Sequence, residues 1–299
     1  MRSNPVYRRE TTVRARSFRM PLIILIFNGL LAVVSLLNMY QAVAQVRILG
    51  QVQYSSFLQL YAFVATLEFL LLMFIMPALT SGSISGERER QTLELLFTTK
   101  MTPSDIVTGK LFSALGQLLV LVVSSFPVLL VTFVYGSVDF LDLGILMICY
   151  VTVAVFAGGL GILFSSLMRR STFSNVCTYG MLLLIAAGTL LLNLFLLNMS
   201  SLRIRNMTVP LGEVKPAADS GGAVYLLLLN PVMTFCEILR GQVSGIIENV
   251  SLERFLGSGP DNFVTQNWVF VSIGLQLAVS LLLIWGAIRV LNPIKNEKN

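Results

Sequence analysis

Hydrophobic positions along the chain gather in six long runs that short polar segments separate. Each run reaches about 20 largely apolar residues, the length that an α-helix needs to cross the hydrocarbon core of a bilayer. The pattern therefore predicts transmembrane helices at approximately 21–46, 56–80, 109–134, 143–168, 173–197 and 266–288. Charges lie only at the extreme edges of these runs, except for Glu68, which falls near the middle of the second.

The segment 198–265 is the only large region outside these runs. It opens with a polar stretch that contains Gly and Pro, which predicts an exposed loop on the extracellular side. The apolar stretch 223–239 follows, but it is short and is interrupted by Asn230 and Pro231. Because Pro231 lacks an amide donor, it would break a continuous helix. We therefore expect a re-entrant or interfacial helical hairpin here, and not a seventh span.

Composition agrees with a chain dissolved in lipid. Of the 299 residues, 55% are hydrophobic and 12% are charged, and the mean hydropathy is +0.80. A soluble domain averages roughly 25% charged residues. The expected fold class is an all-α polytopic membrane protein, with residues 1–299 forming one membrane domain.

Lys and Arg residues predict the orientation of the spans. Fifteen of them lie in the two terminal segments and in the segments after spans two and four, whereas one, Arg47, lies in the short loops on the other side. Basic residues concentrate on the cytoplasmic side of membrane proteins. Both termini and the loop 81–105 are therefore expected in the cytoplasm of a multi-pass cell-membrane protein. The net charge of +6 follows from this bias and does not indicate nucleic-acid binding.

The cytoplasmic N-terminal segment 1–20 is basic, and Val6, Tyr7, Val13 and Phe18 are interspersed among its charges. It is expected to form an amphipathic helix along the inner membrane surface before the first span. The alternative is a disordered basic tail that only fixes the topology.

A run of four consecutive charged residues follows the second span, in SGSISGERERQTLELLFTTK, residues 81–100. Ser85 is the expected N-cap of a helix here, and Glu87 in its first turn would favour the helix dipole. Leu93, Leu96 and Phe97 would share an apolar face. A second helix start follows, with Thr102 as the N-cap, Pro103 at the first helical position and Asp105 at the third. The segment is therefore expected to be two helices with a tight linker, attached rigidly to spans two and three. The alternative is an ordinary solvated loop.

Residues suited to catalysis or metal binding are scarce. The chain has no His, and its three Cys residues do not show the spacing of metal ligands. The fragment Thr108-Gly109-Lys110-Leu111 lacks the preceding glycine and the Ser or Thr of a phosphate-binding loop. We therefore expect no catalytic residue, no metal and no cofactor in this chain.

Glu68 is the one carboxyl inside a span. An ionised carboxylate at the bilayer centre is unfavourable by roughly 2.5–3.5 kcal/mol, so Glu68 should face the protein interior, paired or protonated. It is interpreted as functional, or alternatively as a structural hydrogen-bonding group. The amides Gln117, Asn175, Asn193 and Gln276 are more typical of contacts between helices.

The stretch ISGERERQTLELLFTTKMTPSDIVTGK, residues 84–110, resembles the signature segment of ABC-2-type transporter permeases, the membrane subunits of type 2 ABC exporters. In that family the segment also follows the second span. LLLLNPVMTF, residues 226–235, is similar to the family's Asn-Pro stretch between spans five and six. Gln91 is a departure, since many members carry Gly there, and we expect it to stiffen the helix.

This resemblance implies a permease that works with a separate ATPase subunit, which would use ATP and Mg, and with a second permease chain, identical or related, in a bacterial plasma membrane. The helix 84–98 would be the coupling helix that docks in the ATPase. Its docking residues would be Glu87, Arg88, Glu89, Arg90 and Leu93. Spans two and five would line the translocation pathway, with Glu68, Asn175, Thr178 and Asn193 as candidates.

Two other classes of function remain open from the residues alone. An ion-coupled secondary carrier or channel could use Glu68 as its membrane-embedded site. An intramembrane enzyme would need clustered acids, histidines or a Ser-Lys pair in the spans, and the sequence shows none. The transported substrate is not indicated by any motif.

Overall fold

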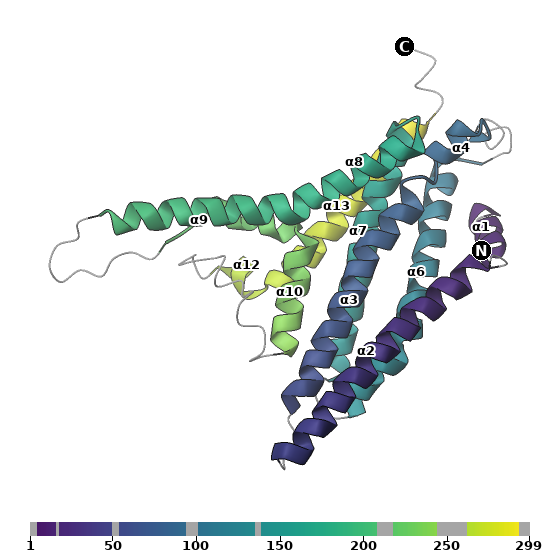
Figure 1. The fold of residues 1–299 in the computed structure, drawn as a ribbon. Helices are drawn as coiled ribbons and strands as arrows, with labels where there is room; N and C mark the ends of the chain where they lie inside the picture. The colour runs from purple at the N-terminus through teal and green to yellow at the C-terminus, as the bar shows by residue number, and fades with distance from the viewer. Residues whose placement is uncertain are drawn as a thin grey trace. The chain divides into compact units, whose positions relative to one another are not determined.

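The computed structural model describes residues 5–15, 18–49, 54–93, 101–134, 139–207, 218–243 and 262–292. These residues form helices and contain no strand (Figure 1). The elements are α1 (Pro5–Ala15), α2 (Arg19–Leu49), α3 (Tyr54–Thr80), α4 (Ser85–Glu89), α6 (Pro103–Val134), α7 (Phe140–Leu167), α8 (Ser171–Leu183), the π-helix η1 (Leu184–Gly188), α9 (Thr189–Arg205), the 3₁₀-helix η2 (Gly221–Leu229), α10 (Pro231–Gln242), α12 (Phe263–Gln266) and α13 (Trp268–Leu291).

Six helices in the described part of the chain are long and apolar enough to cross a membrane. They are α2, α3, α6, α7, the continuous helix Ser171–Arg205 and α13. This confirms the predicted all-α fold with six spans. The fifth is longer than expected, because α8, η1 and α9 run on without a break over 35 residues.

The segment between spans five and six contains the expected bent pair of helices. Gly221–Leu229 and Pro231–Gln242 meet at an angle of 89°. Asn230 forms the break with extended backbone, and Pro231 occupies the first position of α10, where its missing amide hydrogen has no cost. The predicted re-entrant segment is thus two short helices joined at Asn230-Pro231. Residues 208–217 and 244–261 of the predicted loop 198–265 lie outside the described residues.

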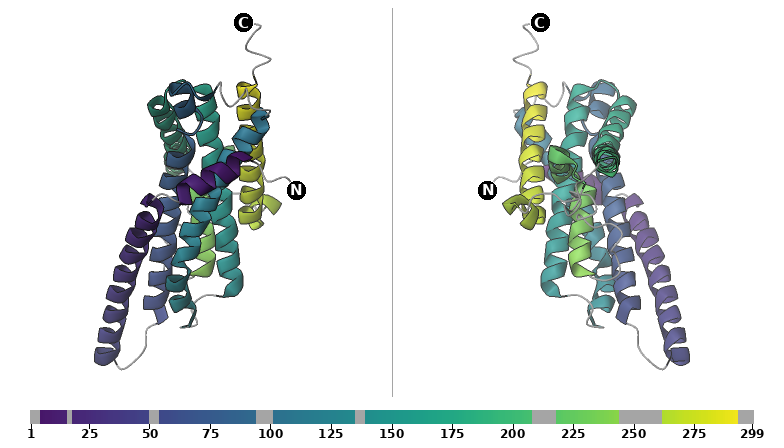
Figure 2. Two further views of the ribbon diagram at one scale, coloured as in Figure 1. Left: turned by 90° about the vertical axis from the view of Figure 1, so that its right-hand side faces the viewer. Right: turned by 90° about the vertical axis from the view of Figure 1, so that its left-hand side faces the viewer.

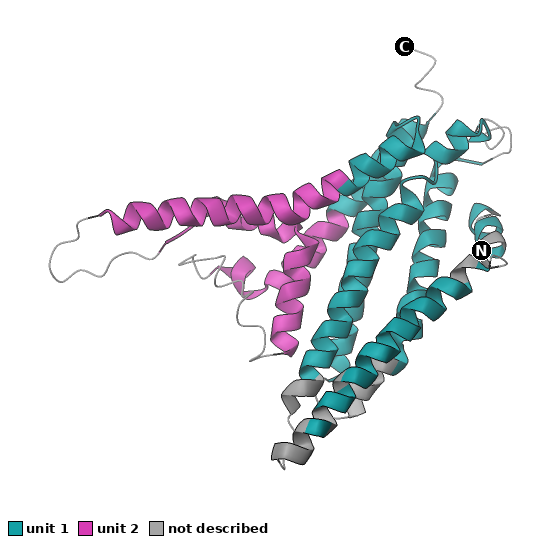
Figure 3. Cartoon of the chain, viewed as in Figure 1, with its two compact units in different colours: residues 1–179, 279–299 teal, residues 180–278 magenta. Residues whose placement is uncertain are grey.

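The chain divides into two compact units (Figure 3). Unit 1 comprises residues 1–179 and 279–299, and unit 2 comprises residues 180–278. Helices α8 and α13 therefore contribute residues to both units.

Unit 1 is built around α3, which packs against α6 and α7, while α2 packs against α3 and α6 (Figure 2). Glycines in α7 bring the helix backbones close together, as small residues do at membrane helix interfaces. A Cβ added at Gly161 would lie 2.0 Å from Thr80 Oγ1, and one added at Gly158 would lie 2.5 Å from Met76 Cε. A larger residue at Gly161 would also meet the Ser81 backbone at 3.1 Å and would force α3 and α7 apart, whereas at Gly158 the flexible Met76 side chain would have to move.

Helix α1 packs against α6, with Val6 buried and Tyr7, Arg8 and Arg9 exposed. The N-terminal helix of the sequence analysis is therefore present over Pro5–Ala15. Its position along the inner membrane surface stays a prediction.

Unit 2 has its own apolar core at the bend between η2 and α10. Val224, Leu227 and Leu228 of η2 pack with Met233 of α10 and Trp268 of α13. The hydrophobic residues on both sides of the Asn230-Pro231 break are thus held by one cluster, which fixes the two short helices together.

Candidate functional site

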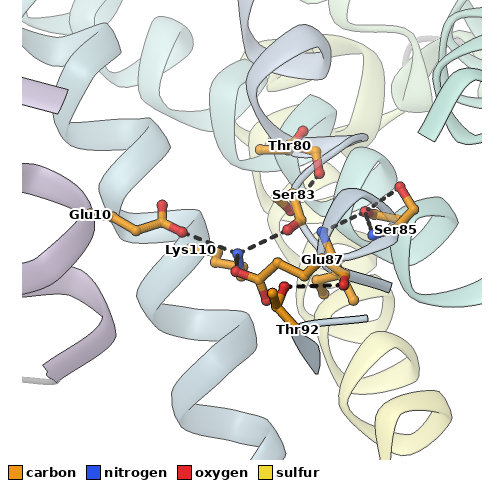
Figure 4. Close-up of polar contacts among 9 residues, drawn as sticks. Glu10, Thr80, Ser83, Ser85, Glu87, Thr92 and Lys110 are labelled. Atoms are coloured by element: carbon orange, nitrogen blue, oxygen red, sulfur yellow. Dashed lines mark hydrogen bonds and ion pairs between the residues drawn. The ribbon is translucent and has the colours of Figure 1, made fainter. Parts of the chain in front are cut away.

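Lys110 joins three elements of unit 1 at the base of the charged loop (Figure 4). It lies in the second turn of α6, and its side chain is only 3% exposed. Its Nζ donates to Glu87 Oε1 of α4 at 2.7 Å, to Glu10 Oε1 of α1 at 3.1 Å and to the Ser83 carbonyl at 2.8 Å. All three protons of the ammonium group therefore have an acceptor.

The chemistry of a buried ammonium explains this arrangement. Removing an ion from water is strongly unfavourable unless counter-charges and hydrogen bonds compensate it. Glu10 and Glu87 supply those charges from two elements that are far apart in the sequence. The ion pairs therefore fix α1 and α4 to the start of α6.

Helix α4 is also fixed to the end of α7. Arg88 donates from Nη1 to the Met168 carbonyl at 3.3 Å and from Nη2 to the Ser166 carbonyl at 3.1 Å. The last carbonyls of a helix lack intrahelical partners, and a guanidinium is a suitable donor for them. Ser165 Oγ in turn accepts from the amides of Ile84 and Ser85 at 2.9 and 3.0 Å, at the start of α4.

Glu89 makes the corresponding contact with the start of α8. Its Oε1 accepts from the Ser171 amide at 2.9 Å, and its Oε2 accepts from the Ser171 hydroxyl at 2.8 Å. A carboxylate at a helix N-terminus satisfies an amide without a partner and is favoured by the helix dipole. Within five residues, α4 thus contacts α6, α7 and α8 through its own charged side chains.

These contacts change how the predicted docking residues are understood. Glu87, Arg88 and Glu89 contact their own chain, while Arg90 is exposed and Leu93 is buried. The family resemblance implies that all five contact an ATPase, and that contact stays a prediction. The structure assigns the first three to the support of the loop.

The expected continuous helix 84–98 is wrong in its middle. Helix α4 ends at Glu89, and Gln91 adopts a positive φ of 56°. The Thr92 amide donates to the Glu87 carbonyl and the Gln91 amide donates to the Arg88 carbonyl, which is the Schellman pattern of helix termination. Gln91 occupies the left-handed position that glycine adopts without strain. Gln91 therefore does not stiffen the helix, because the helix ends before it. Residues 94–98 lie outside the described residues.

The two expected N-caps have different outcomes. Ser85 is not a cap: it is the buried first residue of α4, and its hydroxyl donates to the Ser81 carbonyl. Thr102 is a cap, because its Oγ1 accepts from the Asp105 amide while the Asp105 carboxylate accepts from the Thr102 amide. This reciprocal capping box starts α6 at Pro103 as predicted.

Glu68 faces the interior of unit 1, as expected, with 1% of its surface exposed. Ser125 of α6 and Tyr150 of α7 lie beside its carboxyl group. Neither carboxyl oxygen makes a hydrogen bond of good geometry with the described residues, and the Tyr150 hydroxyl donates to the Ala65 carbonyl at 2.7 Å instead. The described part of the chain therefore leaves a buried carboxyl poorly satisfied inside a span.

The other pathway candidates have separate surroundings. Asn175 accepts a hydrogen bond from the Ser81 hydroxyl, and the Thr178 hydroxyl donates to the Ser174 carbonyl of its own helix. Both lie in unit 1 with Glu68, but no hydrogen bond of the described residues joins them to it. Asn193 is buried in unit 2. Their role in transport stays a prediction.

Asn230 is the centre of a neutral polar cluster in unit 2. Its Nδ2 donates to the Ala186 carbonyl and to Thr189 Oγ1, both at 2.8 Å, and its Oδ1 accepts from the Val232 amide at 2.9 Å. Ala186 belongs to the π-helix η1, where the wider hydrogen-bonding pattern interrupts the regular ladder. Asn230 therefore caps α10 and bonds to the irregular turn of span five.

The same cluster extends to span six. Gln276 Nε2 donates to Thr234 Oγ1 at 2.8 Å and to Ser272 Oγ at 3.0 Å. The Ser272 hydroxyl donates to the Leu228 carbonyl at 2.7 Å, at the end of η2. The backbone at the Asn230-Pro231 bend is thus satisfied by protein groups, which irregular backbone at membrane depth requires.

Sequence reasoning missed the roles of Lys110 and Ser165. Lys110 was considered as a topology charge and as part of the fragment 108–111, and its burial gives no local signal, because a Lys near the end of a span usually extends to the membrane surface. Ser165 gives no such signal, because serines are frequent in spans. The described residues contain no group of three or more His, Cys, Asp and Glu that could hold a metal ion.

Comparison with known proteins places the chain in a family. A search of curated proteins gave no match. A sequence model described as "ABC-2 family transporter protein" matches residues 39–289, which span all the described helices from α3 to α12, the end of α2 and most of α13. Since the match covers most of the chain and includes the 84–110 segment, the chain belongs to the ABC-2 family of transporter proteins and is a multi-pass membrane permease.

Proposed function

We propose that this permease is the membrane subunit of an ATP-driven exporter and that a separate ATPase chain acts on it through the surface around α4. The permease would form the translocation pathway as a pair of chains, identical or related. ATP and Mg would be bound by the ATPase. Both termini would lie in the cytoplasm of a bacterial cell.

The observation that carries this proposal is the set of contacts around α4. One short loop is bonded to α1 and α6 through Lys110, to α7 through Arg88 and Ser165, and to α8 through Glu89. A displacement of this loop would reach all four helices at once. An ordinary solvated loop would instead direct its charged side chains into water.

Lys110 also argues for an ATPase on another chain. It belongs to the only fragment that resembles a phosphate-binding loop, yet its ammonium group is buried between two carboxylates. A phosphate-binding lysine must be accessible to the nucleotide. Lys110 therefore has a structural function.

Two variants test separately whether the surface around α4 binds the ATPase and whether α4 couples ATP hydrolysis to the permease. An ABC-type ATPase is co-expressed with the permease and recovered on a tag carried by the permease. Arg90→Glu changes an exposed charge outside the support contacts and should reduce ATPase recovery. Glu87→Gln weakens the ion pair to Lys110, and should preserve recovery while lowering substrate-stimulated ATP hydrolysis.

Arg203→Glu is the matched control, since Arg203 is exposed on α9 and belongs to the predicted extracellular segment. It should change neither recovery nor hydrolysis. Normal recovery and normal hydrolysis in both loop variants would remove α4 from the coupling surface.

An ion-coupled carrier is the second candidate, and the poorly satisfied carboxyl of Glu68 favours it. In vesicles that contain the permease without an ATPase, such a carrier would move its substrate when a proton gradient is applied, and Glu68→Gln would stop the movement. Transport that needs ATP and an ATPase chain, and that continues without a gradient, would reject this candidate.

A further inference from the structure

A basic pocket lies at the turn between α7 and α8. It has a volume of about 500 Å³ and is lined by Arg169, Arg170, Thr172, Phe173 and Val176. Both arginines are exposed, and neither forms a salt bridge with the described residues. None of the hydrogen bonds that join α4 to α6, α7 and α8 in the described part of the chain is made by these five residues.

The charges around the pocket favour an anion. The Arg88 guanidinium lies close enough to Arg169 for the two positive charges to interact. Glu89 is the nearby carboxylate on the side of Arg170, but it is bonded to Ser171 through both of its oxygens. A ligand that brings negative charge would compensate the excess of guanidinium groups.

The apolar wall of the pocket continues along α8. Phe173 and Val176 are three residues apart and so lie on one face of the helix, where they are 56% and 63% exposed. Each residue of a helix advances about 1.5 Å along its axis. The wall therefore begins at the level of the arginines and runs into the membrane-spanning helix.

We propose that this pocket binds an anionic phospholipid, with its phosphate on Arg169 and Arg170 and an acyl chain along Phe173 and Val176. Guanidinium groups bind phosphate oxygens in pairs of hydrogen bonds, and basic pockets at the cytoplasmic ends of spans suit anionic headgroups. A phospholipid carries its charged headgroup next to its acyl chains, just as the two arginines lie next to the apolar wall of the pocket. The proposal rests on the predicted cytoplasmic position of this turn, which is part of the proposed function.

The test uses the full chain without an ATPase, with Phe173→Trp as a fluorescent reporter in the pocket. The protein is reconstituted in phosphatidylcholine vesicles that contain increasing fractions of phosphatidylglycerol or phosphatidylcholine with brominated acyl chains, which quench tryptophan on contact. The same titration of the chain without the reporter is subtracted. Two arginines at about 1 kcal/mol each predict quenching by phosphatidylglycerol at a roughly 10- to 30-fold lower fraction than by phosphatidylcholine.

Arg169→Gln with Arg170→Gln should remove this preference, while Arg203→Gln with Arg205→Gln, the same change of charge on α9, should preserve it. Equal quenching by the two lipids, or a preference that survives in the 169/170 variant, would overturn the proposal. The ATPase is absent, so that result would leave the proposed coupling at α4 unaffected. If the 169/170 variant instead keeps the lipid preference and loses ATPase recovery in co-expression, the pocket belongs to a protein contact.

Discussion

The polar cluster around Lys110 is ionic, whereas the cluster around Asn230 contains only amides, hydroxyls and carbonyls. The first lies where α6 starts, next to the charged loop, and the second lies at a bend between apolar helices. Each supplies a donor to a carbonyl outside regular α-helix: Ser83 in the turn before α4, and Ala186 in the π-helix η1. The difference indicates that charges are used where a span meets the loop, and that neutral groups are used at the bend between apolar helices. Glu68 is the exception, because it is a carboxyl within a span.

The largest expected effect comes from breaking the ionic cluster. Lys110→Met would remove the buried ammonium group that bonds to Glu87 and Glu10, whose side chains are 25% and 19% exposed, and breaking a fully buried pair destabilises by about 3–5 kcal/mol. We expect a large fall in the thermal stability of the purified chain in detergent. Lys110→Arg keeps the charge and should recover most of the stability. A Lys110→Met chain as stable as the wild type would show that this cluster does not hold α1 and α4.

Breaking the neutral cluster should have a smaller effect. Asn230→Leu removes the bonds to Ala186, Thr189 and Val232, and interhelical hydrogen bonds in membranes average about 0.6 kcal/mol each. We expect a loss of about 1–2 kcal/mol, measured by the same thermal assay. Asn230→Ser keeps a neutral oxygen that can cap α10 and loses the bonds to Ala186 and Thr189, so its stability should lie between those of the wild type and Asn230→Leu. If Asn230→Leu lost as much stability as Lys110→Met, the ionic and the neutral cluster would not differ in their contribution to stability.

At Glu68 we expect a substitution to change stability in the opposite direction. Its carboxyl oxygens have no good hydrogen bond in the described residues, so Glu68→Gln should be neutral or stabilising by about 1 kcal/mol. If Glu68 acts in transport, the same variant should lose transport while it gains stability, because residues that serve function often reduce stability. Glu68→Lys, which adds an unpaired cation, is the control and should destabilise. A clear loss of stability in Glu68→Gln would indicate a structural hydrogen bond.

The smallest effect is expected at the end of α4. Gln91→Gly would relieve the left-handed backbone strain, which amounts to about 1 kcal/mol for a residue with a side chain. The amide of Thr92 makes one of the terminating bonds, so slower hydrogen exchange at this amide would report the gain in local stability. Gln91→Val, which is β-branched, should speed this exchange. Equal exchange in all three chains would contradict the strain.

The sequence predicted what depends on local pattern. The six spans follow from runs of apolar residues, and the start of α6 follows from the spacing of Thr102, Pro103 and Asp105. The end of α4 was wrongly predicted, because the apolar spacing of Leu93 continued a helical pattern through Gln91, and a glutamine does not mark a helix end as glycine does. Lys110, Ser165 and Ala186 acquire their partners only through tertiary packing, so no local pattern could identify those contacts.

Gly161 determines which motions are open to the helix that precedes the loop. Thr80 and the Ser81 amide lie where the side chain of Gly161 would be. The residues one turn away on the same face of α7 are Ala157 and Ser165, and both carry a Cβ. Sliding α3 along α7 by one turn, about 5.4 Å, would bring Thr80 against such a side chain, so we expect α3 and α7 to move together. A displacement of α4 would consequently rotate α3 and α7 together and would not change their register.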